Sequence, residues 1–393
     1  MSRRFDHDAV IVGGGPAGLA TAIALARTAP ELARRTVVLE RARYPRDKYC
    51  AGALGGRGDR VLAELDAEVR VPSVPIAGMS FRAPAGERTE RVGGIGRVVR
   101  RLEFDHALAS HAAQAGVRIE EGARVTAVEP IDGGARVTTS RGELLARAVV
   151  GADGVGSVVR RALGLGRGRL RAQVLEVDTE AVPGDPPRDV LRFDASDRGL
   201  PGYTWDFPTS VGGEPLVCRG IYHLKWGDAE PDLETVFAER LAQQGLSLER
   251  YTNKRFAERG LEPSETLARG SILLAGEAAG IDPVTGEGIA QALEYGAMAG
   301  RFLAEVLVHR RPVEGWTGLV ARSRLGLDLR VRARLVEEFF GPHRPEVEAL
   351  ILGAPSVLRS GARHFGALEH EGRDLASLAL ATAKHYLRAL LTL

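Results

Sequence analysis

The fold of this chain is decided near its start, where residues 9–18 read AVIVGGGPAG. An apolar run such as 9–12 is typical of a strand buried on both faces. It leads into a G-x-G-x-x-G turn, and the residues that follow, 19–26, are strong helix formers. A second apolar run, 36–39, ends at Glu40. A strand, a glycine turn, a helix and an acid in this order predict a parallel α/β unit that binds a dinucleotide.

Three glycines of this turn have separate physical tasks. Gly13 permits the tight turn, Gly15 lets the backbone approach a pyrophosphate, and Gly18 lets the helix lie against the sheet. Free N–H groups at the start of the helix then face the phosphate charge. We expect Glu40 to accept hydrogen bonds from the ribose hydroxyls of the adenosine half. This segment by itself does not decide between FAD and NAD.

Length and composition are those of a globular protein with two or three domains. The chain has 393 residues, 44% of them hydrophobic, which excludes wholesale disorder. Its 53 Lys and Arg residues balance 51 Asp and Glu residues, so we expect no nucleic-acid partner. The histidines show no metal-binding spacing and the two cysteines lie far apart, so we expect neither a metal site nor a disulfide framework. There is no run of ~18 apolar residues for a membrane span and no secretory signal, which predicts a cytoplasmic location.

Two later segments repeat the order of strand, glycine turn and helix. Residues 147–160 read RAVVGADGVGSVVR, and residues 271–290 read SILLAGEAAGIDPVTGEGIA. Their motifs GADG-x-x-S-x-x-R and GEAAG-x-x-P-x-x-G-x-G resemble the second and third FAD motifs of the group-A flavoprotein hydroxylase, halogenase and geranylgeranyl reductase superfamily. Residues 101–108, RLEFDHAL, match the R-x-x-F-D-x-x-L segment of the same proteins. The resemblance therefore indicates FAD as the cofactor.

The resemblance also implies an architecture. It predicts an α/β fold with a Rossmann-like FAD-binding domain of the p-hydroxybenzoate hydroxylase type, an inserted antiparallel β-sheet substrate domain and a helical C-terminal tail. By this scheme the FAD-binding domain comprises residues 1–70, 97–165 and 265–310, the substrate domain 71–96 and 166–264, and the helical region 311–393.

Individual cofactor contacts follow from the same resemblance. Glu277 would hold the ribityl chain, although these proteins usually carry Asp there, and Asp153 would stand near the flavin and the NAD(P)H approach. Arg101 would contact the cofactor. The turn 286–288 would place a positive helix end beside the flavin N1 and C2 carbonyl, which stabilises the anionic reduced flavin. The full set of expected FAD-binding residues is Gly13, Gly15, Pro16, Ala17, Gly18, Glu40, Arg41, Cys50, Ala51, Arg101, Val125, Asp153, Gly154, Gly276, Glu277, Pro283, Gly286, Glu287, Gly288 and Ile289.

The segment between the second and third motifs carries the substrate signal. Residues 201–208 read PGYTWDFP, so on a strand Tyr203, Trp205 and Phe207 share one face. An aromatic stripe of this kind often serves only as core. This stretch resembles the Y-x-W-x-F-P motif of the geranylgeranyl reductase family, and residues 48–54, KYCAGAL, look like that family's K-x-C-x-G-x-L turn. The resemblance implies FAD-dependent reduction of isoprenoid C=C bonds, with an apolar tunnel that ends at the flavin and these three rings along it.

Other functions fit the same scaffold. An FAD monooxygenase acting on an apolar or aromatic compound is the first alternative. Flavin halogenases carry W-x-W-x-I-P and a substrate-domain lysine, whereas this chain has Tyr203 and no lysine between residues 49 and 224. A non-catalytic flavin sensor also fits the cofactor motifs. No second G-x-G-x-x-G stands between a strand and a helix, so NAD(P)H docks transiently or a separate electron carrier supplies the electrons.

Reduction of an isolated alkene needs a proton as well as a hydride. Cys50, Tyr203 and Asp282 are the candidate donors, each with a structural alternative. Cys50 also fits a small buried hydrophobe, Tyr203 a packed ring with its hydroxyl on a backbone carbonyl, and Asp282 an N-cap of the next turn.

The last residues, 376–393, form an amphipathic helical pattern. We expect them to pack on the substrate domain, with peripheral membrane contact as the alternative that a lipid substrate suggests. The oligomeric state stays open at this stage.

Overall fold

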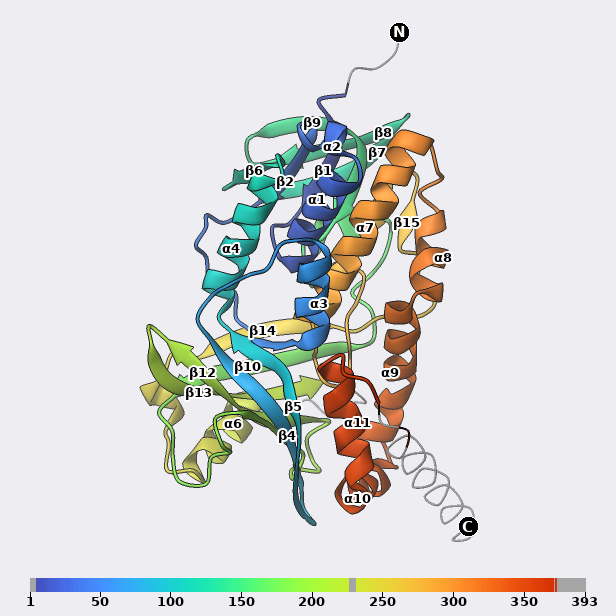
Figure 1. Ribbon diagram of the computed structural model, residues 1–393. Coiled ribbons are helices and arrows are strands. Elements are labelled where there is room, and N and C mark those ends of the chain that lie inside the picture. The colour runs from blue at the N-terminus through green and yellow to red at the C-terminus, as the bar shows by residue number, and fades with distance from the viewer. Residues whose placement is uncertain (1–4, 226–230, 371, 373–393) are drawn as a thin grey trace, which may run out of the picture.

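The described residues form two β-sheets of eight strands each, one in the upper and one in the lower half of Figure 1. This computed structural model describes residues 5–225, 231–370 and 372. The expected helical stretch 376–393 lies outside the described residues. No helix among the described residues has the length and apolar character needed to cross a membrane.

The first sheet is built around β1 (His7–Val12), whose neighbours β2 (Thr36–Glu40) and β9 (Gly142–Gly151) both run parallel to it. The strands follow the order β15-β16-β9-β1-β2-β6, and an antiparallel ladder β7-β8 continues from β9. Residues 9–12 are buried on both faces, which explains their unbroken apolar run. The other strands of this sheet are β6 (Arg118–Glu121), β7 (Val125–Ile131), β8 (Gly134–Thr139), β15 (Ala268–Arg269) and β16 (Ile272–Leu274).

The three glycine turns meet at one edge of this sheet. Strands β1, β9 and β16 are parallel neighbours, and Val12, Gly151 and Leu274 stand in register at their carboxyl ends. Carboxyl ends of adjacent parallel strands lie side by side, and this edge is where ligands of open α/β sheets bind. The segments that follow these strands therefore converge although more than a hundred residues separate each from the next.

Helices cover the first sheet, and two of them touch along their backbones. The helix α1 (Pro16–Thr28) packs on α7 (Ile289–His309), which runs beside it in Figure 1. A Cβ at Gly296 would lie 2.4 Å from the Ala17 carbonyl oxygen, so the α7 backbone needs glycine there. The remaining helices around this sheet are α2 (Pro30–Ala33), α3 (Gly56–Glu64), α4 (Arg101–Gln114), α5 (Val158–Ala162), the 3₁₀ turn η2 (Gly276–Ala278) and α8 (Gly315–Arg322).

The second sheet has the order β14-β10-β13-β12-β11-β4-β5-β3. Its neighbours pair antiparallel except for β4 and β11, which are parallel. These two strands come from separate parts of the chain and no hairpin joins them, so nothing imposes an antiparallel pair. The elements of this half are β3 (Ala53–Gly55), β4 (Ser73–Ala83), β5 (Gly86–Val99), β10 (Arg171–Thr179), β11 (Val190–Asp194), β12 (Gly202–Val211), β13 (Glu214–Leu224), α6 (Leu233–Ala242), the 3₁₀ turn η1 (Leu248–Arg250) and β14 (Lys254–Arg259).

The two faces of the second sheet differ in chemistry. Alternate residues of β12 point to opposite faces, so Trp205 and Phe207 lie on one side and Asp206 on the other. On the polar side the buried Arg219 guanidinium donates to Asp206 and Asp185, both at 2.7 Å. The aromatic side stays free of charged pairs along β12 and faces three late helices, α9 (Arg324–Phe340), α10 (Arg344–Gly353) and α11 (Pro355–Phe365).

Candidate active site

The first glycine turn forms a cradle that leaves no room for a side chain at two of its glycines. Gly13 has a positive φ of 104°, and a Cβ there would lie 2.4 Å from the Ala152 carbonyl oxygen. A Cβ at Gly18 would lie 1.9 Å from the Gly13 carbonyl oxygen, because α1 starts directly against the turn. Pro16 and Ala17 open this helix, whose N-terminus no side chain caps. Its first N–H groups are thus available to an anionic ligand.

Glu40 closes the cradle from the end of β2. The residue is 5% exposed, and its Oε2 accepts a hydrogen bond from the Gly14 N–H at 3.0 Å. The position beside the glycine turn is the one that the sequence analysis expects for a ribose-binding acid. Arg41, the next residue, is exposed.

Two guanidinium groups converge on this turn. Arg101 is buried and forms a bidentate pair with Asp105, both bonds being 2.7 Å. Its Nη2 lies 3.8 Å from the Cβ position of Gly15. Arg46 donates to the same Asp105 at 3.0 Å and to the Gly14 carbonyl oxygen at 2.9 Å. Two cations beside an open helix N-terminus suit a diphosphate. Arg46 was not predicted from the sequence, because a single basic residue in an irregular loop carries no pattern.

The second and third glycine motifs, which follow β9 and β16, lie next to each other. A Cβ at Gly154 would lie 3.5 Å from Oε2 of Glu277, and the other oxygen of Glu277 is buried without a hydrogen-bond partner among the described residues. A free buried carboxylate oxygen suits a ligand hydroxyl such as those of a ribityl chain. Asp153 accepts a hydrogen bond at 2.7 Å from the N–H of Val158, the first residue of the short helix α5, whose N-cap is Ser157. Val125 begins β7 as a buried residue.

A third turn, 283–288, leads into α7. Gly286 has a positive φ of 66°, and no side chain caps α7, which begins at Ile289 after Gly288. A helix start of this kind carries partial positive charge. This turn and the segment Cys50–Ala53 both line one wall of a cavity, so the expected cofactor residues of two distant segments lie together.

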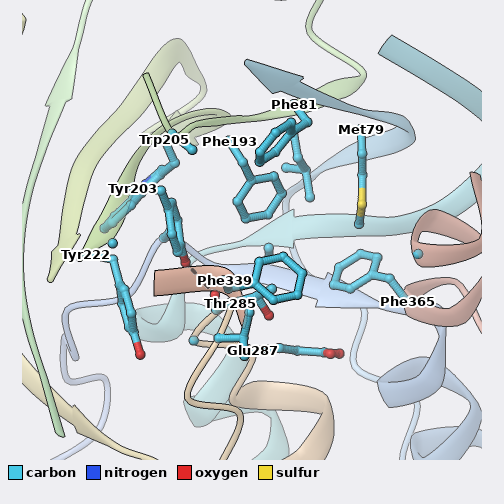
Figure 2. Close-up of a pocket in the computed structure, with 18 of the residues that line it drawn as sticks. Met79, Phe81, Phe193, Tyr203, Trp205, Tyr222, Thr285, Glu287, Phe339 and Phe365 are labelled. Carbon is cyan, nitrogen blue, oxygen red and sulfur yellow. Dashed lines mark hydrogen bonds between the residues drawn. The ribbon is translucent and has the colours of Figure 1, made fainter. Parts of the chain in front are cut away.

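The cavity has a volume of about 300 Å³ and lies between the aromatic face of the second sheet and α9–α11. Ten of the chain's 21 aromatic side chains line it, which makes it chiefly apolar. Figure 2 shows Phe81, Phe193 and Phe339 gathered within it, with Thr285 and Glu287 on the side of the third turn. The aromatic residues that line the cavity are Phe81, Phe193, Tyr203, Trp205, Phe207, Tyr222, Phe256, Phe339, Phe340 and Phe365.

The three predicted substrate-binding rings stand on one wall of this cavity. The ring centres of Tyr203 and Trp205 are 6.2 Å apart, and those of Trp205 and Phe207 are 6.1 Å apart. Two further rings of the cavity, Phe193 and Phe339, were not predicted from the sequence. Each is one apolar residue within an ordinary strand or helix pattern, so no local signal marks it.

Two tyrosines bind the third turn to the second sheet. The Tyr203 hydroxyl donates to the Thr285 carbonyl oxygen, and the Tyr222 hydroxyl donates to the Pro283 carbonyl oxygen at 2.8 Å. The two rings stack with centres 5.2 Å apart. Burial raises the pKa of both phenols well above the usual value, so both keep their protons. This arrangement matches the structural alternative given for Tyr203.

Cys50 lies at the cavity wall next to a buried acid. Its backbone N–H donates to Glu176 at 3.0 Å, and its sulfur accepts from the Gly52 N–H at 3.4 Å. Burial raises the pKa of the Cys50 thiol, against the opposing charge of Arg101, so the thiol is protonated at neutral pH. Burial also raises the pKa of Glu176 to about 7. Glu176 was not predicted from the sequence, because it occupies an ordinary position in the alternating pattern of β10.

Asp282 directly precedes the third turn and is bonded to it. It is 1% exposed, its Oδ1 accepts from the Val284 N–H at 2.8 Å, and its Oδ2 accepts from the Thr285 hydroxyl. The same oxygen is ion-paired with Arg332 of α9. These bonds are those of a turn cap, and Asp282 is absent from the cavity lining.

Comparison with known proteins agrees with this geometry. Residues 6–315 match a family model described as FAD binding domain. The chain is 29% identical to a digeranylgeranylglycerophospholipid reductase of Methanosarcina mazei over 77% of this chain and 76% of that protein. It is also 29% identical to a menaquinone reductase of Mycobacterium tuberculosis over 85% of this chain and 84% of that one.

Solved structures show the same fold. A geranylgeranyl bacteriochlorophyll reductase-like protein from Thermoplasma acidophilum superposes with a TM-score of 0.68 at 21% identity, covering 97% of this chain and 96% of that chain. The halogenase PltM gives the same TM-score, 0.68, at 17% identity, with 92% and 85% of the two chains covered. These likenesses confirm the predicted α/β architecture of the hydroxylase type.

The residues present fit FAD. The cradle excludes a Cβ at Gly13 and Gly18, two guanidinium groups flank the pyrophosphate turn, and Glu277 keeps a free buried oxygen where a ribityl hydroxyl is expected. The predicted resemblance to geranylgeranyl reductases is confirmed by the relatives found. This chain belongs to the FAD binding domain family and is an FAD-dependent oxidoreductase similar to the geranylgeranyl reductases.

Proposed function

We propose that this protein reduces C=C bonds in the isoprenoid chain of a lipid or a small apolar molecule. The observation that carries the proposal is the aromatic cavity, whose wall includes the turn Gly286–Ile289 at the start of α7. An apolar cavity beside the expected flavin position suits a hydrocarbon chain that has to reach the redox centre. Relatives named for digeranylgeranyl lipids, geranylgeranyl diphosphate and menaquinone support an isoprenoid substrate.

The chain's own residues bind and orient the substrate. The rings of β12 and α9 bury an apolar chain and exclude water from it. When bound, reduced FAD supplies a hydride from its N5 to one alkene carbon. The N-terminus of α7 places positive charge at the third turn, which favours the anionic reduced form of the cofactor.

The electron donor belongs to the proposal as well. The donor is either NAD(P)H, which would dock transiently, or a separate electron carrier. The absence of a second G-x-G-x-x-G between a strand and a helix supports a transient donor site. Turnover with NADH, NADPH or a reduced ferredoxin separates these donors.

The proposal is tested by anaerobic single turnover. The FAD-loaded protein is reduced with dithionite and mixed with geranylgeranyl diphosphate, a digeranylgeranylglycerophospholipid or menaquinone. We expect the absorbance of oxidised flavin to return and the prenyl chain to gain two hydrogens for each bond reduced, measured by mass spectrometry. Mass fragments must place these hydrogens in the tail of menaquinone, because the quinone ring is itself an electron acceptor.

A phytanyl analogue with no C=C bonds is the matched control and has to leave the flavin reduced. If no unsaturated chain reoxidises the flavin without oxygen, isoprenoid reduction is wrong. An oxygenated product in air from an apolar or aromatic compound would identify a monooxygenase instead.

A further inference from the structure

Glu258 places a carboxyl group where the cavity meets the third turn. It belongs to the edge strand β14 and lines the cavity. Its Oε2 is buried and has no hydrogen-bond partner among the described residues. A Cβ at Gly286 would lie 2.7 Å from this oxygen and 3.3 Å from the Tyr222 ring, so Gly286 lies close to both side chains. A carboxyl oxygen that is buried in a cavity without a hydrogen-bond partner indicates that it binds a ligand or has a chemical role.

The charges around Glu258 favour its protonated form. Burial raises its pKa well above the usual value, and the carboxylates of Glu277, Asp282 and Glu176 raise it further. Lys48 is the one cation among these influences and acts in the opposite direction. The rings of Tyr203 and Tyr222 also face this site, and their phenols keep their protons. The carboxyl therefore keeps its proton to a higher pH than an exposed glutamate does.

Among the described residues, Glu287 is the second carboxyl of the cavity with an unpartnered oxygen, and it differs from Glu258 in the charges around it. Glu287 also has a buried oxygen without a partner, but its other oxygen lies 3.8 Å from the Arg332 guanidinium. Burial raises the pKa of Glu287, while Arg332 and Arg57 oppose the shift. Arg332, Arg57 and His364 thus lower the pKa of Glu287, whereas Lys48 is the one basic residue that does so for Glu258.

The other acidic groups are less suited to give up a proton. The Tyr203 hydroxyl donates to the Thr285 carbonyl oxygen, and Asp282 is ion-paired with Arg332. Cys50 keeps a thiol, which is intrinsically a weaker acid than a carboxyl group. A general acid works best when it holds its proton at the working pH and still releases it readily, and a buried carboxyl meets both conditions.

We propose that the Glu258 carboxyl group donates the proton that completes alkene reduction. This inference rests on the proposed function. As the π electrons of the alkene form a C–H bond with the Glu258 proton, the O–H bond electrons stay on the carboxylate. The other alkene carbon, which becomes electron-deficient, accepts a hydride with both electrons of its bond, which reduced FAD would supply. Water reprotonates the carboxylate, and the oxidised cofactor regains two electrons from the external donor.

The test compares Glu258→Gln with wild type in anaerobic single turnover. Glutamine keeps the shape of the side chain and loses the acid, so we expect the reduction rate to fall about 100-fold or more. The FAD content is expected to match wild type. Glu258→Asp retains the acid one methylene further away and should fall between the two. Glu234→Gln, on an exposed side chain of α6, is the matched control and should keep the wild-type rate.

The pH profile and the infrared spectrum give independent readings. The wild-type rate should fall as pH rises through the pKa of Glu258, whereas the residual rate of Glu258→Gln should not follow that titration. In substrate-free protein, a C=O stretching band of a protonated carboxylic acid should be present in wild type and missing in Glu258→Gln. Loss of this band at high pH must coincide with loss of the wild-type rate.

The outcomes separate the two proposals. A Glu258→Gln rate within threefold of wild type, or no difference band in the infrared spectrum, overturns the role of Glu258 and leaves isoprenoid reduction standing. If wild type reduces no unsaturated chain, the proposed function fails and the role of Glu258 in it fails as well. The infrared band still reports the protonation of Glu258 in that case.

Discussion

Glu176 illustrates how much the position of one side chain can depend on the whole fold. It is fully buried on β10, where its Oε1 accepts from the Cys50 N–H and its Oε2 accepts weakly from the Cys218 thiol at 3.8 Å. Lys254 is the nearest cation, at 3.9 Å. Burial outweighs that cation, so the pKa of Glu176 rises to about 7.

We predict that Glu176 makes the wild-type protein less stable as the pH rises from about 4.5 to 7, and that Glu176→Gln lacks this loss of stability. Unfolded Glu loses its proton near pH 4.3, whereas native Glu176 holds it to about pH 7, so the native state binds more protons and wild-type stability falls as pH rises. The accumulated difference is about 3 kcal/mol. The glutamine side chain of the variant cannot titrate, and its amide oxygen can still accept from the Cys50 N–H. Urea unfolding at several pH values checks this, and parallel curves for the two proteins would contradict it.

Residue positions were predictable where the pattern is local. Gly13, Gly18 and Glu40 follow from one strand–turn–helix unit, because their spacing fixes their geometry. Glu258 and Arg46 did not follow from it. Glu258 reaches the cavity through the pairing of β14 with β10, and this long-range register leaves no trace in the local sequence.

At the level of elements, the contact of α1 with α7 sets the distance between two parts of the expected FAD site. A Cβ at Gly300 would lie 2.4 Å from the Thr21 carbonyl oxygen. One turn earlier, a Cβ at Gly296 would lie equally close to the Ala17 carbonyl oxygen. Both helices begin at a glycine turn, at Pro16 and at Ile289. Backbone contact along their length therefore holds these two N-termini in a fixed relation.

Gly300→Ala should destabilise the protein by about 1–3 kcal/mol, because the added methyl meets rigid backbone and has to push the helices apart. Gly361→Ala is the matched control, since it lies in α11 with nothing within 4 Å of its Cβ position. Removing a glycine there should stabilise by up to about 1 kcal/mol. Thermal unfolding measures both, and FAD content should fall only for Gly300→Ala. Equal shifts in both variants would contradict the close approach.

The elements themselves were predictable to different degrees. The parallel core follows from its apolar runs, and β12 follows from its alternation. The parallel pairing of β4 with β11 did not follow, because a strand's own pattern gives its faces but not its neighbour.

At the scale of the whole molecule, one arginine joins the cofactor half to the late helices. Arg57 of α3 donates to Glu294 of α7 through two bonds of 3.0 Å and to Asp328 of α9 at 2.9 Å. It also lies 2.9 Å from the His364 ring nitrogen of α11. With a side chain only 6% exposed, it satisfies acids from two helices at once.

Arg57→Met should cost about 3–5 kcal/mol at neutral pH, because it leaves buried carboxylates without their cation. Arg301→Met is the control, since its side chain is half exposed and its pair with Glu64 should be worth less than about 1 kcal/mol. We expect limited proteolysis to cut α9–α11 faster in Arg57→Met. Chemical unfolding measures the cost, and similar losses in the two variants would contradict a central role for Arg57.

The overall architecture was predictable by resemblance because three glycine motifs in order specify one known arrangement of the first sheet. The wall formed by α9–α11 was expected only as a helical region. Its helices have ordinary amphipathic patterns, and which surface they cover depends on shapes formed by the rest of the chain.

Because of that wall, separate parts of the chain form the expected cofactor site and the cavity. The expected cofactor-binding stretches end near residue 289, while one side of the cavity is formed by side chains from residues 332–365. Substitutions in α10 and α11 can remodel the space for a ligand and leave the glycine cradle untouched. Evolution can therefore change which electron acceptor fits the cavity by altering these three helices, while the residues expected to hold the cofactor stay the same.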